Sequence, residues 1–299
     1  MLCFENVRKV YKDFELNCSM RVEPGCITGL IGPNGAGKST AFKAALGLIR
    51  TDGGRMEILG KPADQLLPSD REQIGVVLAD YTPEAFQKMM DVESFGGEGR
   101  GYIVESTGDL LPVLDHLYHG FSREEFKQNC RKLSLPMDKK IGEFSTGMKR
   151  KLQLLAAVSH DADLLILDEP TSGLDVIARD QLLGLLREYM EKDGRSILIS
   201  SHISADLEGF CDDVYLIDQG RIILHEETDN LLNRYGLLKV TPEQYAGLDQ
   251  AYILKSRRED FGYSCLTDQK QFYVENYLNI VIERGSIDEL IMMMNGRES

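Results

Sequence analysis

The sequence predicts an α/β fold followed by a small α+β extension. Mostly apolar runs at residues 26–31, 164–167, 196–200 and 214–217 have the composition of strands buried on both faces of a parallel sheet. Helical segments lie between these runs, which is the pattern of an α/β protein. Beyond Gly236 the apolar runs become shorter and are separated by polar turns, and this change indicates the extension.

In the first half of the chain, the expected strands and helices follow one another in a defined order. Residues 15–22 alternate as in a half-buried strand, and the run at 26–31 leads into a glycine-rich loop and then a helix over 39–48. Further helices are expected at 110–118 and 122–133. The glycine cluster at 96–101 is expected to be a flexible insertion, because no apolar strand leads into it.

The extension carries apolar runs at 237–240, 252–254, 272–274 and 280–282 and ends in a helix that begins near Ser286. The apolar residues Ile287, Leu290, Ile291 and Met294 share one face of this helix. A helix packed on the core explains this face better than a helix that binds a membrane.

Composition limits the class of protein. The 299 residues include 42% hydrophobic and 27% charged residues, as in a soluble globular protein, and this length is compatible either with one large domain or with a large domain and a smaller companion. The net charge of −14, from 34 Lys and Arg against 48 Asp and Glu, argues against nucleic acid as a partner. Six scattered cysteines without metal-ligand spacing predict reduced thiols in a cytosolic protein.

Nothing in the sequence predicts a membrane span or a secretion signal. The N-terminal residues place charged side chains ahead of any long apolar run. A spanning helix needs roughly 20 apolar residues, and no stretch approaches this length. If a membrane is involved, another chain is expected to supply its spanning part.

The glycine-rich loop has the P-loop pattern of glycine, four residues, then Gly-Lys-Ser, between a buried strand and a helix. Such a loop turns backbone N–H groups toward phosphate oxygens. Lys38 is expected to reach the β and γ phosphates of ATP, and Ser39 is expected to bind Mg²⁺. The predicted nucleotide-binding residues are Gly32, Pro33, Asn34, Gly35, Ala36, Gly37, Lys38, Ser39 and Thr40.

Two carboxylates follow the apolar run at 164–167. Asp168 stands at the end of this predicted strand and is expected to hold Mg²⁺, usually through water. Glu169 is then available to orient and deprotonate the attacking water near the γ-phosphate. An Asp-Glu pair alone is more often the solvated start of a helix, and it is the P-loop that favours the catalytic interpretation.

With these two motifs the chain resembles the ATP-binding cassette (ABC) family over residues 4 to about 232. Three further motifs appear in the family's order: residues 144–148 at the signature, 172–175 at the D-loop, and His202 at the switch histidine. The resemblance implies a mixed sheet with a RecA-like core in residues 1–234, a helical subdomain at about 83–150, and an added extension at 235–299.

The resemblance also implies roles for individual residues. Two cassettes pair head to tail, so that the signature residues Ser145, Thr146, Gly147 and Met148 of one chain meet the ATP of the other. His202 would contact the γ-phosphate, and Asp175 would lie across the interface. Tyr11 matches the aromatic residue that stacks on adenine. Ser145 would also serve as an ordinary helix N-cap, a role that is compatible with the first. The structural alternative for Tyr11 is a core residue.

Two departures from the family pattern are visible. The family usually has a glutamine after the strand corresponding to 74–78, where this chain has Ala79 and Asp80. Asp80 could supply an oxygen near Mg²⁺ or the attacking water in place of that glutamine, or the role could be vacant. In the signature, Thr146 and Met148 replace a glycine and a glutamine, so Ser145 and Gly147 remain as expected phosphate contacts. The form of residues 145–152 is similar to the bacterial ABC-2-type and antibiotic or peptide exporter subgroup.

The predicted function is therefore an ATP-hydrolysing subunit that drives transport, with export favoured, through a separate membrane-spanning permease. The expected partners are this permease and a second cassette, either identical or different. The expected location is cytoplasmic, on the inner face of the membrane. A soluble ABC-type ATPase, for example in iron–sulfur assembly, is the main alternative, and a silent cassette is disfavoured because the catalytic residues are present.

Overall fold

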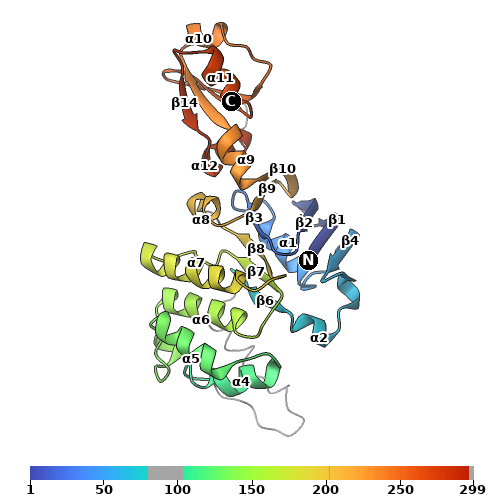
Figure 1. Ribbon diagram of the computed structural model, residues 1–299. Helices are drawn as coiled ribbons and strands as arrows, with labels where there is room; N and C mark the ends of the chain where they lie inside the picture. The colour runs from blue at the N-terminus through green and yellow to red at the C-terminus, as the bar shows by residue number, and fades with distance from the viewer. Residues whose placement is uncertain (80–103, 202, 296–299) are drawn as a thin grey trace.

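The computed structural model describes residues 1–79, 104–201 and 203–295. Figure 1 shows an elongated molecule, with helices from residues 110–190 at one end and a small sheet from the C-terminal residues at the other. The main sheet lies between them. The predicted flexible insertion at 96–101, together with Asp80 and His202, falls outside the described residues.

The main sheet has six strands in the order β10-β9-β3-β8-β7-β6. Strands β9, β3, β8, β7 and β6 run parallel, and β10 pairs with β9 in the antiparallel direction, so the predicted mixed sheet is confirmed. The strands are β3 (Ile27–Ile31), β6 (Ile74–Val77), β7 (Leu164–Asp168), β8 (Ser196–Ser200), β9 (Asp213–Asp218) and β10 (Arg221–Glu227). The predicted apolar runs therefore form the centre of this sheet.

A second, antiparallel sheet comes from the N-terminal part of the chain, in the order β2-β1-β4-β5. Its strands are β1 (Leu2–Val10), β2 (Glu15–Val22), β4 (Gly53–Ile58) and β5 (Lys61–Pro62). Helix α1 (Lys38–Ala45) packs between the two sheets, where Phe42 is fully buried beside Leu30 and Ile58. Two short helices, η1 (Ala63–Gln65) and α2 (Pro68–Arg71), lead on to β6.

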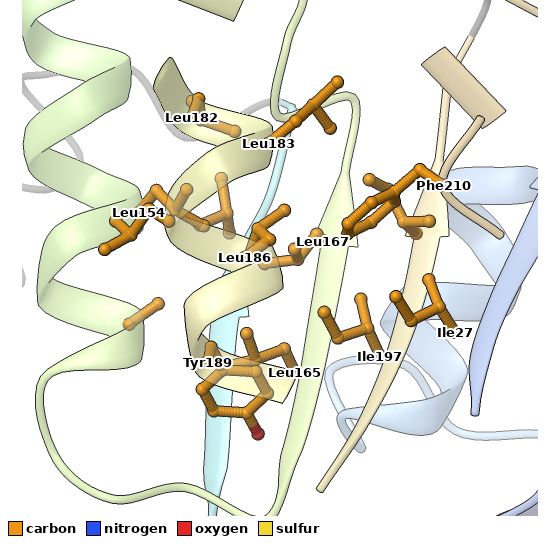
Figure 2. Close-up of a cluster of buried hydrophobic side chains, with 14 of the residues drawn as sticks. Ile27, Leu154, Leu165, Leu167, Leu182, Leu183, Leu186, Tyr189, Ile197 and Phe210 are labelled. Carbon is orange, nitrogen blue, oxygen red and sulfur yellow. The ribbon is translucent and has the colours of Figure 1, made fainter. Parts of the chain in front are cut away.

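Helices cover the other face of the main sheet and extend beyond it. They are α4 (Leu110–Leu117), α5 (Arg123–Lys132), η2 (Ile141–Glu143), α6 (Thr146–Val158), α7 (Val176–Met190) and α8 (Ser204–Glu208). Figure 2 shows how Leu154 of α6 and Leu186 of α7 meet Leu167 of β7 in one apolar cluster. This packing joins the helical end of the molecule to the sheet that carries the P-loop.

The C-terminal extension is a four-stranded antiparallel sheet in the order β12-β13-β11-β14. It follows helix α9 (Thr228–Arg234) and contains β11 (Gly236–Val240), α10 (Pro242–Ala246), β12 (Ile253–Glu259), β13 (Gly262–Thr267), α11 (Lys270–Asn276), β14 (Val281–Arg284) and α12 (Ile287–Asn295). Three of the predicted apolar runs contribute to strands, but the run at 272–274 lies in α11, where Tyr273 packs on the sheet. Strand β13 was not among those runs, because Ser264 and Thr267 interrupt its apolar pattern.

Helix α12 is a core helix, as predicted. Ile287, Leu290 and Met293 are buried together with Leu237 and Leu266 of the extension, and Ile291 and Met294 pack against the same cluster. Among the described residues no helix is both long and apolar enough to cross a bilayer. All six cysteines are free, as the sequence predicted.

Candidate functional site

The P-loop connects β3 to α1 and is pressed against the turn between β9 and β10. The amide of Gly220 in this turn donates a hydrogen bond to the carbonyl of Ala36 (2.8 Å). A Cβ atom at Gly32 would lie 2.1 Å from the carbonyl oxygen of Ile217, and Gly37 has a φ of +114°. Only glycine fits these two positions without movement of the backbone.

The loop lines a cavity of about 490 Å³ beside the carboxyl ends of β6 and β7. The lining residues are Phe14, Pro33, Asn34, Gly35, Gly37, Lys38, Ser39, Thr40, Ala79, Arg150, Glu169 and Ser172. Seven of the nine predicted P-loop residues therefore share with Glu169 one cavity of a size that suits a small molecule, whereas Gly32 and Ala36 do not line it.

Lys38 is a cation of this cavity wall and lies close to Glu169. Its ammonium group donates hydrogen bonds to the carbonyls of Gly32 (2.7 Å) and Pro33 (3.3 Å), and lies 3.9 Å from the Glu169 carboxylate. Burial lowers the pKa of Lys38, while the negative charges of Glu169 and Asp168 oppose this shift. The arrangement holds a positive charge where phosphate oxygens can meet it.

The end of β7 is held by Ser200 at the end of β8, through the Asp168 carboxylate and the Glu169 main chain. The Ser200 hydroxyl donates to the Asp168 carboxylate (2.6 Å) and accepts from the Glu169 amide (2.9 Å). Asp168 is almost fully buried, and Glu169 adopts a φ of +52°, an uncommon conformation for a residue other than glycine. Sequence reasoning did not assign Ser200 a role, although the parallel pairing of β7 with β8 places it opposite Asp168.

The residues present fit a magnesium ion that is bound together with a nucleotide. Ser39 lines the cavity, and Asp168, which directly precedes the lining residue Glu169, has a buried carboxylate. The described residues contain no group of three or more His, Cys, Asp or Glu that could hold a metal by themselves. Mg²⁺ usually takes one or two protein oxygens and completes its shell with phosphates and water, so two protein oxygens are sufficient.

The signature residues lie outside this cavity, at the start of α6. The hydroxyl of Ser145 accepts a hydrogen bond from the Met148 amide (3.2 Å) as the helix N-cap, and Ser145 and Thr146 are exposed. A Cβ atom at Gly147 would lie 3.3 Å from the side chain of Leu174 in the D-loop, so the two motifs are neighbours. The signature is thus presented to the outside of the chain.

The D-loop leads into an exposed apolar surface. The carboxylate of Asp175 caps α7 by accepting from the Ala178 amide (2.8 Å). The next two residues, Val176 and Ile177, expose 76% and 73% of their surface. Exposed apolar residues beside an exposed motif are typical of a surface that meets a partner.

Tyr11 lies near the cavity but does not line it. Its ring centroid is 6.3 Å from that of Phe14, and the Lys9 ammonium group lies 5.6 Å above the Tyr11 ring. Phe14 lines both the cavity described above and a neighbouring cavity of about 680 Å³ that also contacts Pro33, Asn34 and Gly35. Sequence reasoning missed Phe14. The signal that could have found it is a second aromatic residue only three positions after Tyr11.

The wall opposite the P-loop contains Ala79 and Arg150. Ala79 stands where the family has glutamine, and Arg150 of α6 donates to the carbonyls of Leu78 (3.4 Å) and Ala79 (3.3 Å). Arg150 is a second lining residue that sequence reasoning missed. Asp80 and His202 are not among the described residues, so their predicted roles stay predictions.

The fold and the cavity define a P-loop nucleotide-binding protein of the α/β class. The family model described as ABC transporter matches residues 16–172. The chain belongs to the ABC transporter family, and it is an ATP-binding, ATP-hydrolysing subunit of that family.

Relatives and solved structures agree with this assignment. Nod factor export ATP-binding protein I of Cupriavidus metallidurans is 33% identical over 239 residues, which cover 78% of this chain and 73% of that protein. The protein of the same name from a Rhizobium species is 30% identical over 292 residues, 94% of this chain and 91% of the relative. A solved ATP-binding subunit of an ABC transporter has a TM-score of 0.63 at 27% identity, covering 77% of this chain and 91% of that chain.

Proposed function

We propose that this ATPase drives export through a separate membrane-spanning permease, from the cytoplasmic face of the membrane, as one of two paired cassettes. The two relatives named above are described as export proteins, and one of them matches 94% of this chain, including most of the extension. We also propose that residues 1–234 act as the motor domain, with 235–299 as an added domain.

The observation that carries the paired mechanism is the separation of two halves of one site. Lys38 and Glu169 line the cavity, whereas the exposed residues Ser145 and Thr146 lie outside it. A signature that acts on ATP therefore needs a second chain, whose P-loop it would face. The exposed side chains of Val176 and Ile177 beside the D-loop support a partner surface at the same place.

Each residue then has a defined task in hydrolysis. The P-loop amides and Lys38 bind the phosphates, and Glu169 orients and deprotonates the attacking water. Ser39 and Asp168 would hold Mg²⁺, which neutralises charge on the phosphates when bound. Loss of the γ-phosphate removes the contacts of Ser145 and Gly147 from the partner and opens the pair. His202 and Asp175 complete the site as the family resemblance implies.

A groove between the main sheet and the helices is the proposed contact for the permease. It has a volume of about 420 Å³ and an apolar lining that includes Leu46, Leu48, Val76, Leu114 and Tyr118. Leu48 exposes 59% of its surface. An apolar groove of this kind can receive an amphipathic helix, and in the ABC family the helical subdomain receives a helix of the membrane subunit.

Hydrolysis of ATP and the mass in solution test the paired mechanism. The unsubstituted chain should hydrolyse ATP only with Mg²⁺, and Glu169→Gln should lose at least about 100-fold in rate while forming an ATP-dependent dimer. A Glu169→Gln chain that hydrolyses ATP at the parental rate, or that stays a monomer while it binds ATP, would refute the assignment. The control is Glu188→Gln on α7, whose carboxylate pairs with Lys132 at the surface.

Coupling to the permease is tested in membranes. Leu48→Asp should reduce stimulation of the ATPase by a co-expressed permease, because it places a charge in the apolar groove. The rate of the isolated chain should stay the same, since Leu48 does not line the ATP cavity. Equal stimulation of Leu48→Asp and the parent chain would reject the groove as the contact.

A further inference from the structure

Arg150 has no role in the proposed mechanism so far, yet it borders the ATP cavity. It lies in α6, shortly after the signature, and its guanidinium group shares the cavity wall with Glu169 and Ala79. One terminal nitrogen donates to the carbonyl of Leu78 (3.4 Å) and to the side chain of Gln153 (3.4 Å), and the other donates to the carbonyl of Ala79 (3.3 Å).

These carbonyl oxygens belong to the segment that departs from the family pattern. Leu78 and Ala79 directly follow β6, and the methyl group of Ala79 can form no hydrogen bond. In this chain the segment is held at the cavity through its main chain, by a planar group that spans two neighbouring carbonyls. Arg150 thus fixes this segment at the cavity through hydrogen bonds to its main chain, which the methyl side chain of Ala79 cannot do.

The charge of Arg150 suits this place. Burial lowers its pKa, and the negative charges of Asp168 and Glu169 oppose that shift. The two carboxylates therefore favour the charged guanidinium at the wall that faces the P-loop. A nucleotide bound by the P-loop would bring its phosphate groups toward this cation.

Helix α6 also begins with the signature. Ser145 is the N-cap of α6, and Arg150 follows within the next helical turns. One rigid helix therefore presents the signature to the outside and Arg150 to the ATP cavity of its own chain. In a pair of cassettes, each copy of α6 would contact both ATP molecules.

We propose that Arg150 is a positioning residue that holds the Leu78–Ala79 main chain at the ATP cavity and connects the nucleotide of its own chain to the signature on the same helix. This inference rests on the proposed paired mechanism and adds a coupling path to it. ATP bound by one chain would orient that chain's signature for the partner's ATP.

The experiment compares Arg150→Ala and Arg150→Lys with Lys149→Gln, which removes a charge from the same helix outside the cavity lining. Arg150→Ala should lower the maximal rate about 10-fold and move the Hill coefficient for ATP toward about 1. Arg150→Lys should recover less than half of the loss, because an ammonium group is a point charge that does not span two carbonyls. Lys149→Gln should behave like the parent.

Two further measurements separate positioning from packing. The affinity of Arg150→Ala for ADP should stay close to that of Lys149→Gln, because ADP lacks the γ-phosphate. The melting temperatures of the two variants should also stay close to each other. In the Glu169→Gln background, Arg150→Ala should raise the ATP concentration for half-maximal dimerisation about 10-fold. This measurement needs no hydrolysis, so it also applies if the permease is required for activity.

The inference is overturned if Arg150→Ala keeps the parental Hill coefficient and dimerises at the parental ATP concentration. It is also overturned if ADP affinity, melting temperature and rate fall together, because Arg150 is then only a packing residue. Failure of the paired mechanism looks different. In that case Glu169→Gln with an intact Arg150 forms no ATP-dependent dimer at all.

Discussion

The two walls of the ATP cavity are built in different ways. One wall comes mostly from a single continuous segment, residues 33–40, whose backbone follows one loop and the start of one helix. The opposite wall brings together Ala79, Arg150, Glu169 and Ser172, from the end of β6, from α6 and from the turn after β7. Departures from the family pattern occur at Ala79 on the second wall, and none occurs in the P-loop.

The difference follows from the groups that each wall offers to a ligand. The P-loop offers main-chain N–H groups, so its geometry depends on glycines at fixed places and tolerates little change. The second wall offers side chains from separate segments, and a cation on α6 can hold the main chain of a segment whose Ala79 side chain forms no hydrogen bond. Three substitutions test this comparison, from the largest expected effect to the smallest.

Gly32→Ala should have the largest effect, because it disturbs the wall that tolerates least. The added Cβ would lie 2.1 Å from the Ile217 carbonyl, so the loop must move. We expect ATP affinity, measured by titration calorimetry, to fall about 100-fold, which corresponds to about 2.8 kcal/mol of binding free energy. Gly184→Ala on α7 is the control, since a Cβ there meets no atom within 4 Å. Near-parental binding by Gly32→Ala would show that the loop adapts.

Ser200→Ala should lower the rate of hydrolysis about 10- to 100-fold with a smaller change in ATP affinity, because it removes the hydrogen bonds that fix the Asp168 carboxylate and the Glu169 amide, the residues proposed to act on metal and water. Ser196→Ala is a matched control on the same strand. Its hydroxyl also accepts from one amide, that of Gly25, and donates to one oxygen, that of Glu23. Both variants should lose about 1–3 kcal/mol of stability by thermal unfolding. Equal rates for the two variants would contradict a special role for Ser200.

Phe14→Ala should give the smallest effect, because Phe14 belongs neither to residues 33–40 nor to the second wall and lines the ATP cavity together with the neighbouring one. Loss of a ring that stacks on a base costs about 1–3 kcal/mol, so the KM for ATP should rise about 10-fold. Tyr11→Ala should change KM by less than about 3-fold, since Tyr11 does not line the cavity. If Tyr11→Ala has the larger effect, the prediction from the sequence is right, and the ring moves when ATP binds.

Sequence reasoning reached most of the main sheet. The runs at 26–31, 164–167, 196–200 and 214–217 lie in strands, because strands buried on both faces are apolar throughout and stand out in a sequence. The extension was harder. Residues 272–274 belong to a helix, and β13 was missed, because short half-buried elements of a small domain have weak periodicity.

By itself the sequence determined the P-loop, the carboxylates Asp168 and Glu169, and the family, because each depends on residues that are adjacent in the chain or recur in a fixed order. The tertiary structure alone decided that Ser200 holds the Asp168 carboxylate and the Glu169 amide, that Phe14 borders the cavity, and that Arg150 supports the segment at Ala79. These contacts join residues far apart in the sequence, and strand order and helix packing bring them together. A local sequence pattern does not contain the distance between two separate segments, because that distance is set by how the core packs.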